Sequence, residues 1–179
     1  MLRVLLTVTF VALAWANDSS CGAKEPSVVA NCDKIDRGSC GNSCCMVDVH
    51  IPGTAVNTSY LHELVTGYLS GGKDGSYTHE TAPDAAGHNP GEDLTPYPIK
   101  WDYIFQGTHT TTGGYVDTLN FNIARASSTG TSMRIFSISN IHGALGDNGQ
   151  TYKNIAFLLS GIQPRESGWS ITIAHGCGS

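Results

Sequence analysis

Charged side chains are scarce in this sequence, and the basic ones do not cluster. Ten Lys and Arg stand against 15 Asp and Glu in 179 residues, and charged residues make up 14% of the chain. No stretch combines several basic residues with aromatic ones, so we expect no binding to nucleic acid or to an anionic membrane surface. No apolar run reaches the ~20 residues that a membrane-spanning helix needs, so we expect no membrane span.

Motifs of common hydrolases and metal enzymes are absent as well. The sequence has no Gly-x-Ser-x-Gly element for a nucleophilic serine, and its histidines form no His-x3-His or metalloprotease pattern. The acidic stretch 73–93 has carboxylates that suit calcium, but their spacing fits no calcium-binding loop. We therefore expect no metal and no other cofactor, with the histidines dispersed. The seven histidines are His50, His62, His79, His88, His109, His142 and His175.

The N-terminus has the three parts of a secretory signal peptide. Arg3 supplies a positive charge, residues 4–14 form a short apolar stretch, and Ala-Trp-Ala ending at residue 16 is a small-x-small cleavage site. We expect residues 1–16 to be removed and the mature protein to be secreted to the extracellular space. The alternative, a buried N-terminal helix, is disfavoured because a polar Asn-Asp-Ser-Ser run follows at once.

All six cysteines follow the expected cleavage site, and an even number in a secreted chain indicates three disulfides. If all six pair, Cys177 must bond to one of the other five, which all lie in the N-terminal quarter. Such a bridge closes a loop of more than about 130 residues and stabilises the fold by about 4–5 kcal/mol. A zinc site is the less favoured alternative, because no second ligand pair lies at a finger-like distance. The cysteines are Cys21, Cys32, Cys40, Cys44, Cys45 and Cys177.

One glycosylation sequon stands out in the expected mature chain. Asn57-Thr58-Ser59 matches the acceptor pattern, which makes Asn57 the candidate glycosylation site of a secreted protein. A second match begins at Asn17, which would be the mature N-terminal residue and therefore a poor acceptor.

Hydrophobic patterns after residue 44 predict an α+β fold. Helical spacing predicts two helices, the first capped by Thr58 or Ser59, and residues 70–98 show no period, which is typical of a functional or disordered loop. The order β-α-β-β-β-α-β predicts an antiparallel sheet of about five strands with two helices on one face, in a single domain over residues 45–179. Residues 17–44 should form an irregular, Cys-rich, disulfide-stapled segment. Alternation predicts strands over residues 45–51, 99–106, 115–123, 133–138 and 169–173, and helical spacing predicts helices over 61–69 and 152–159.

Residues 136–155 carry a pattern that is similar to a known family. The pattern has Ser137-x-Ser139, then a glycine, then Asp147-x-Gly149, then a helix with Lys153 before an isoleucine. It resembles the signature of domain-of-unknown-function family 1499, and residues 117–121 are similar to that family's preceding strand. The resemblance covers residues 99–162. It implies no activity, because none is established for the family.

This stretch also contains the best candidate ligand site of the sequence. A helix N-terminus beside glycines has free backbone N–H groups and can hold an anion. The favoured interpretation is simpler: Asp147 caps the second helix, and Gln150 completes a capping box. The candidate ligand-binding residues are Ser137, Ser139, His142, Asp147, Asn148 and Lys153.

Three functions are compatible with these patterns. The favoured hypothesis is a non-enzymatic secreted binding module for an unknown extracellular ligand or protein, with an aromatic patch around Trp101, Tyr103 and Phe105. The alternative is a secreted hydrolase or metal-dependent enzyme, which requires convergent titratable groups. A structural extracellular-matrix protein is the third hypothesis. The enzyme hypothesis requires His142 and Asp147 to meet at least one of His79, His88 and His109.

Overall fold

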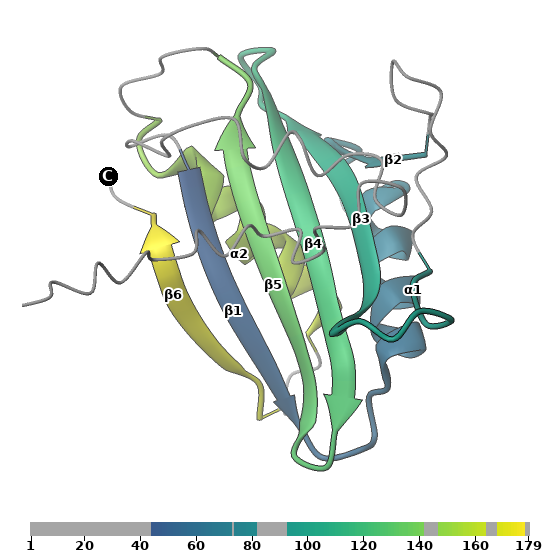
Figure 1. The fold of residues 1–179 in the computed structure, drawn as a ribbon. Helices are drawn as coiled ribbons and strands as arrows, with labels where there is room; N and C mark the ends of the chain where they lie inside the picture. The colour runs from purple at the N-terminus through teal and green to yellow at the C-terminus, as the bar shows by residue number, and fades with distance from the viewer. Residues whose placement is uncertain (1–43, 73, 82–92, 142–146, 164–167, 178–179) are drawn as a thin grey trace, which may run out of the picture.

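A six-stranded antiparallel sheet carries both helices on one of its faces (Figure 1). The computed structural model describes residues 44–72, 74–81, 93–141, 147–163 and 168–177. This confirms the predicted α+β class, with β2 as an additional strand. The elements are β1 (Cys44–Pro52), α1 (Thr58–Leu69), β2 (Tyr77–Glu80), β3 (Trp101–Thr110), β4 (Val116–Ser127), β5 (Gly130–Ser139), α2 (Gln150–Ile162) and β6 (Ser170–Gly176).

The order of strands across the sheet is β2-β3-β4-β5-β1-β6. Strands β3, β4 and β5 form a meander, while β1 lies between β5 and the last strand, β6. Cys45 is therefore the register partner of Gly176, and it forms a disulfide with Cys177 at a Cα–Cα distance of 4.2 Å. The bridge joins residues 132 positions apart and confirms that Cys177 bonds to the N-terminal group of cysteines.

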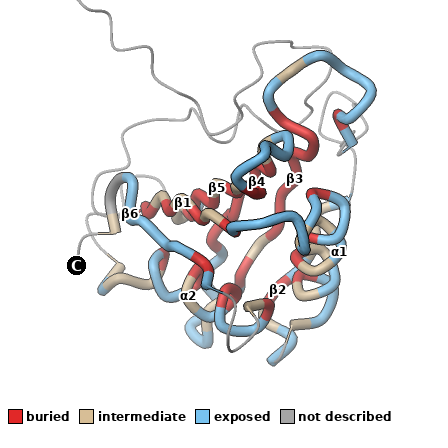
Figure 2. Tube along the Cα trace, turned by 90° about the horizontal axis from the view of Figure 1, so that it is seen from below, coloured by how far each residue is buried: buried red, intermediate tan, exposed pale blue. Residues whose placement is uncertain are grey.

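The main core lies between the sheet and the two helices. Leu61, Val65 and Leu69 of α1 and Phe121 of β4 are fully buried there, and burying a side chain of this size contributes about 1.5–3 kcal/mol. A Cβ on Gly107 of β3 would lie only 2.8 Å from Leu69 Cδ2, so glycine at this position allows α1 to pack closely on the sheet. Figure 2 shows this burial along β3, β4, β5 and β1, and the exposed edge at β6.

The helix starts differ from the predicted ones. The N-cap residue of helix α1 is Asn57 rather than the predicted Thr58 or Ser59, and its side chain accepts the Tyr60 backbone N–H. The N-cap residue of α2 is Gly149 rather than the predicted Asp147. The Asp147 carboxylate, two residues earlier, still accepts from the backbone N–H groups of Gly149 and Thr151 at 2.9 and 2.8 Å. The predicted capping box is wrong, because the side chain of Gln150 donates to Asn154 instead. Within the described ranges, neither helix has the length and apolar character required to cross a membrane.

The face of the sheet opposite the helices is called the outer face below. The predicted alternation places Trp101 on the same face as Tyr103 and Phe105, but the β3–β4 register shifts between Trp101 and Tyr103. A shift of this kind moves a side chain to the other face. Trp101 therefore packs with Leu94 and Ile104 on the outer face, while Tyr103 and Phe105 join the core. The three residues therefore form no shared surface patch: Tyr103 and Phe105 lie in the core, and Trp101, on the other face, is only 6% exposed.

Candidate functional site

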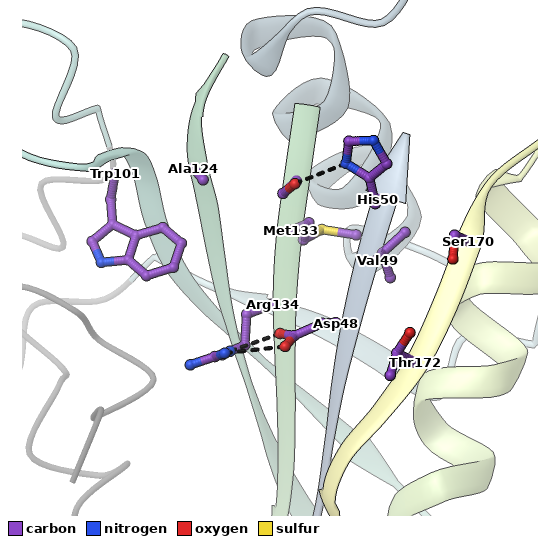
Figure 3. A pocket seen from close by; sticks show the side chains of 10 residues that line it. Asp48, Val49, His50, Trp101, Ala124, Met133, Arg134, Ser170 and Thr172 are labelled. Atoms are coloured by element: carbon purple, nitrogen blue, oxygen red, sulfur yellow. Dashed lines mark hydrogen bonds and ion pairs between the residues drawn. The ribbon is translucent and has the colours of Figure 1, made fainter. Parts of the chain in front are cut away.

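The strand register arranges polar side chains in rows across the outer face. Side chains from five strands meet there because paired residues of neighbouring strands point to the same face. A pocket of about 270 Å³ opens over two such rows (Figure 3). The first row is Trp101, Ala124, Ser132, His50 and Ser170, and the second is Ile104, Asn122, Arg134, Asp48 and Thr172.

A two-pronged ion pair forms the centre of the pocket lining. Arg134 Nε donates to Asp48 Oδ1 at 2.7 Å, and Arg134 Nη2 donates to Asp48 Oδ2 at 3.0 Å. This fork geometry fixes the planes of both groups. The Asp48 side chain is 44% exposed, and a carboxylate accepts about four hydrogen bonds, so a ligand can reach an acceptor whose direction is already set.

The rest of the lining combines hydroxyl, imidazole and aromatic groups. His50 Nδ1 is 3.1 Å from Ser132 Oγ, and Ser170 and Thr172 approach from the edge strand β6 (Figure 3). Trp101 stands on the opposite side of the pocket, with Lys100 Nζ 4.7 Å from its ring centroid. The described residues contain no group of three or more His, Cys, Asp or Glu that could hold a metal ion.

A second polar cluster lies on the helix side of the sheet, near the N-terminus of α2. Asp117 of β4 is the register partner of both His109 on β3 and Ser139 on β5. Asn154 Nδ2 donates to Asp117 Oδ2 at 2.7 Å and to Ser137 Oγ at 3.4 Å. Asp117 and His109 are only 3% and 7% exposed, so both titratable groups are withdrawn from solvent.

Burial shifts these two titratable groups in opposite directions. Burial raises the pKa of Asp117, although the Asn154 hydrogen bond and the charge of His109 lower it in part. Burial lowers the pKa of His109, against the opposing attraction of Asp117 and Asp74. The Nδ1 atom of His109 is buried without a hydrogen-bond partner. Burial therefore disfavours the charged form of both groups.

The residues predicted as a ligand site fall around this cluster. Ser137 is fully buried and Ser139 is paired with Asp117, whose pKa also rises through the charge of Asp147. Lys153 Nζ donates to the Asn148 carbonyl at 3.0 Å. Asp147 accepts the backbone N–H groups that an anion would use, which supports capping over anion binding. The remaining candidate, His142, lies outside the described residues.

The convergence expected for an enzyme is found only in part. The charges of His109 and Asp147 both act on the pKa of Asp117, whereas His79 packs edge-on against Phe105 at 6.2 Å between ring centroids. His88 and His142 lie outside the described residues. Of the other described histidines, His50 lines the pocket and His62 stacks on Tyr103 at 4.4 Å, which places them in separate surroundings.

The pocket residues are the ones that sequence reasoning missed. Asp48, His50 and Arg134 are ordinary polar positions on the outer side of alternating strands, and only the register brings them together. Asp117 did carry a signal, because it interrupts the apolar side of the pattern over residues 115–123.

Comparison with known proteins gives no match. No protein family matches the chain, and neither a curated protein nor a solved structure matches it. The resemblance to family 1499 therefore stays a prediction, and function must be argued from the geometry of the two polar sites.

Proposed function

We propose that this protein is a secreted, non-enzymatic binding module that holds a small, neutral, hydroxyl-rich ligand, such as one sugar unit, in the outer-face pocket. The observation that carries the proposal is the forked Arg134–Asp48 pair in the pocket lining. It presents a donor group and an acceptor group in fixed planes, side by side. Neighbouring hydroxyls of a sugar, each able to donate and accept, are complementary to such a surface.

The size of the pocket supports a small ligand. Pockets for drug-sized ligands measure about 300–1,000 Å³, and this one measures about 270 Å³. One ring therefore fills it, and a longer chain of sugar units would extend over the exposed edge at Ser170 and Thr172.

The charge balance supports a neutral ligand. Arg134 and Asp48 neutralise each other at 2.7 Å, so the pocket offers no net attraction to an anion or a cation. The hydroxyls of Ser132, Ser170 and Thr172 add uncharged donors and acceptors to this lining. Trp101 adds an apolar wall against which the C–H face of a ring can pack.

The test is a titration of the ¹⁵N-labelled protein with a panel of monosaccharides. We expect saturable shifts at β1, β5 and β6, and an affinity at least about tenfold lower in Arg134→Met, because hydrogen bonds to charged groups contribute about 1.5–3 kcal/mol. Lys153→Met is the matched control, since it removes the same charge from α2 on the other face. The proposal fails if no sugar binds, or if the shifts centre on Asp117 and His109.

A further inference from the structure

The outer face is buried over β3, β4 and β5, although both helices lie on the other face (Figure 1). Asn120 and Asn122 are 0% exposed and Phe136 is 3% exposed. Toward β6 the same face is open, and Ser170 and Thr172 are exposed. Among the described residues, Leu94 packs on this face at the start of β3, where it contacts Trp101 and Ile104.

Several buried polar atoms on this part of the face have no partner. Both amide atoms of Asn122, the Nδ2 atom of Asn120 and the indole nitrogen of Trp101 are buried without a hydrogen bond. Such atoms are rare in native proteins, and several on one face require a common explanation. A stretch of polypeptide that covers this face could satisfy all of these atoms, because every non-proline peptide unit supplies both a hydrogen-bond donor and an acceptor.

Cys44 links this face to the N-terminal part of the chain. Successive side chains of a strand point to opposite faces, and Cys45 points into the core, where it bonds to Cys177. Cys44 therefore points to the outer face. It is also disulfide-bonded, and none of the described cysteines is free. Since Cys45 and Cys177 bond to each other, the partner of Cys44 is one of the three remaining cysteines, which all lie between residues 21 and 40.

We propose that residues 17–43 lie across the outer face over β3, β4 and β5 and pair with the amides of Asn120 and Asn122. The segment has about 27 residues of about 3.3 Å each, and neighbouring strands are about 4.8 Å apart, so its length is ample. Its apolar stretch, residues 28–30, suits packing against Phe136 and Ile138. The pocket over Asp48 and Arg134 is then the part of the face that the segment leaves open. This inference does not rest on the proposed ligand.

Photo-crosslinking in the secreted chain tests which residues cover the face. A benzoylphenylalanine at Ile138, which is half-buried and lies next to Cys44 in the register, should cross-link to peptides within residues 17–43. The same group at the exposed Thr172 is the matched control and should give at least about tenfold fewer such products. Cross-links to residues 82–92 or to a second copy of the chain, or no cross-link at all, would overturn the proposal. An intact Cys45–Cys177 bridge and a cooperative thermal transition establish that the labelled protein is folded.

A second measurement tests the amide pairing. If Asn122 pairs with the segment, Asn122→Leu removes those hydrogen bonds and lowers the Tm by about 3–6 °C. An unchanged or raised Tm would overturn the pairing, because a truly unpaired amide is better replaced by a leucine of similar size. Thr172→Val, on the open part of the face, should leave the Tm within about 1 °C. Disulfide mapping must also find Cys44 bonded to Cys21, Cys32 or Cys40.

Discussion

His109 and Asp117 face each other on neighbouring strands, and burial shifts the pKa of each in the direction that disfavours its charged form. Their register partnership and burial explain this, because a charge withdrawn from water is costly even beside an opposite charge. Asn154 donates to Asp117 whether the carboxyl is charged or neutral, so the hydrogen bond survives either state. Two residues of the core thus make the stability of the fold depend on pH in opposite senses.

His109 should limit stability on the acid side of neutrality. Its pKa in the folded protein lies below the ordinary value of 6.5, so the unfolded chain binds the proton more readily. The stabilisation is complete above pH 6.5 and is lost as the pH falls through the folded pKa. We therefore expect the Tm of the His109→Gln variant to fall less between pH 7 and pH 5 than the Tm of the parent protein does. Calorimetry at both pH values measures this. Equal acid slopes in the two proteins would contradict this.

Asp117 should lower the stability of the fold as the pH rises, the opposite of the pH dependence expected for His109. Its folded pKa is raised above the ordinary 3.8, so its contribution is complete below pH 3.8 and is lost as the pH rises through the folded pKa. Asp117→Asn keeps an oxygen that can accept from Asn154 without ever carrying a charge. The difference in Tm between this variant and the parent should therefore grow in favour of the variant from pH 3 to pH 7. A difference in Tm that stays constant between pH 3 and pH 7 would show that the charge of Asp117 does not affect the stability of the fold.

At the level of elements, the two helices touch at a glycine. A Cβ on Gly161 of α2 would overlap the ring of Tyr68 on α1, whereas a Cβ on Gly67 would meet nothing within 4 Å. Tyr68 is held by an edge contact with Tyr77, at 5.3 Å between ring centroids. It therefore cannot move aside without disturbing the contact between α1 and the sheet.

This pair of glycines gives a matched test of helix packing. Gly67→Ala should stabilise the protein by roughly 0.5–1 kcal/mol, because alanine favours the helix. Gly161→Ala makes the same chemical change but forces Tyr68 away, and it should destabilise by about 1–3 kcal/mol. Urea unfolding of both variants measures the two effects. A gain in stability from Gly161→Ala would mean that the helices are not in close contact.

The elements also show where sequence patterns succeed and fail. Long alternating runs such as β4 were predictable, because Leu119, Phe121 and Ile123 repeat with period two against the core. Strand β2 could not be predicted, because four residues are too few to show an alternation of apolar and polar side chains. Its position depends on backbone pairing with β3, which leaves no mark on the sequence. Trp101 was assigned to the wrong face because a bulge leaves no mark on the alternation.

At the scale of the whole molecule, the disulfide between Cys45 and Cys177 links the edge strand β6 covalently to its neighbour β1. Among the described strands, β6 pairs with β1 alone. Its Ile171 and Ile173 are about half exposed, so little apolar burial stabilises this strand. Elimination among six cysteines predicted that Cys177 bonds to the N-terminal group. It did not predict Cys45 as the partner, because that depends on β1 lying beside β6.

Removal of this disulfide should increase local opening of the edge strand β6 more than that of the other strands. We expect Cys177→Ser to lower the free energy of unfolding by about 2–5 kcal/mol. Amide exchange should accelerate most in β6, while β3 and β4 in the middle of the meander keep their protection. Hydrogen-exchange mass spectrometry distinguishes this from a uniform loss of stability. Uniform acceleration across all strands would contradict a local role of the bridge.

Because β1 lies between β5 and β6 in the sheet, its pairing must wait until those two later strands have been synthesised. Among the described strands β1 is the first to leave the ribosome, yet it pairs with the last two of them. Asp48 meets Arg134 after 86 further residues, and Cys45 meets Cys177 after 132. Until then β1 lacks both of the strands it pairs with in the sheet, and Cys45 lacks its final disulfide partner. Any earlier disulfide of Cys45 must therefore be exchanged before the Cys45–Cys177 bridge can form, which makes the completion of this edge of the sheet a late event.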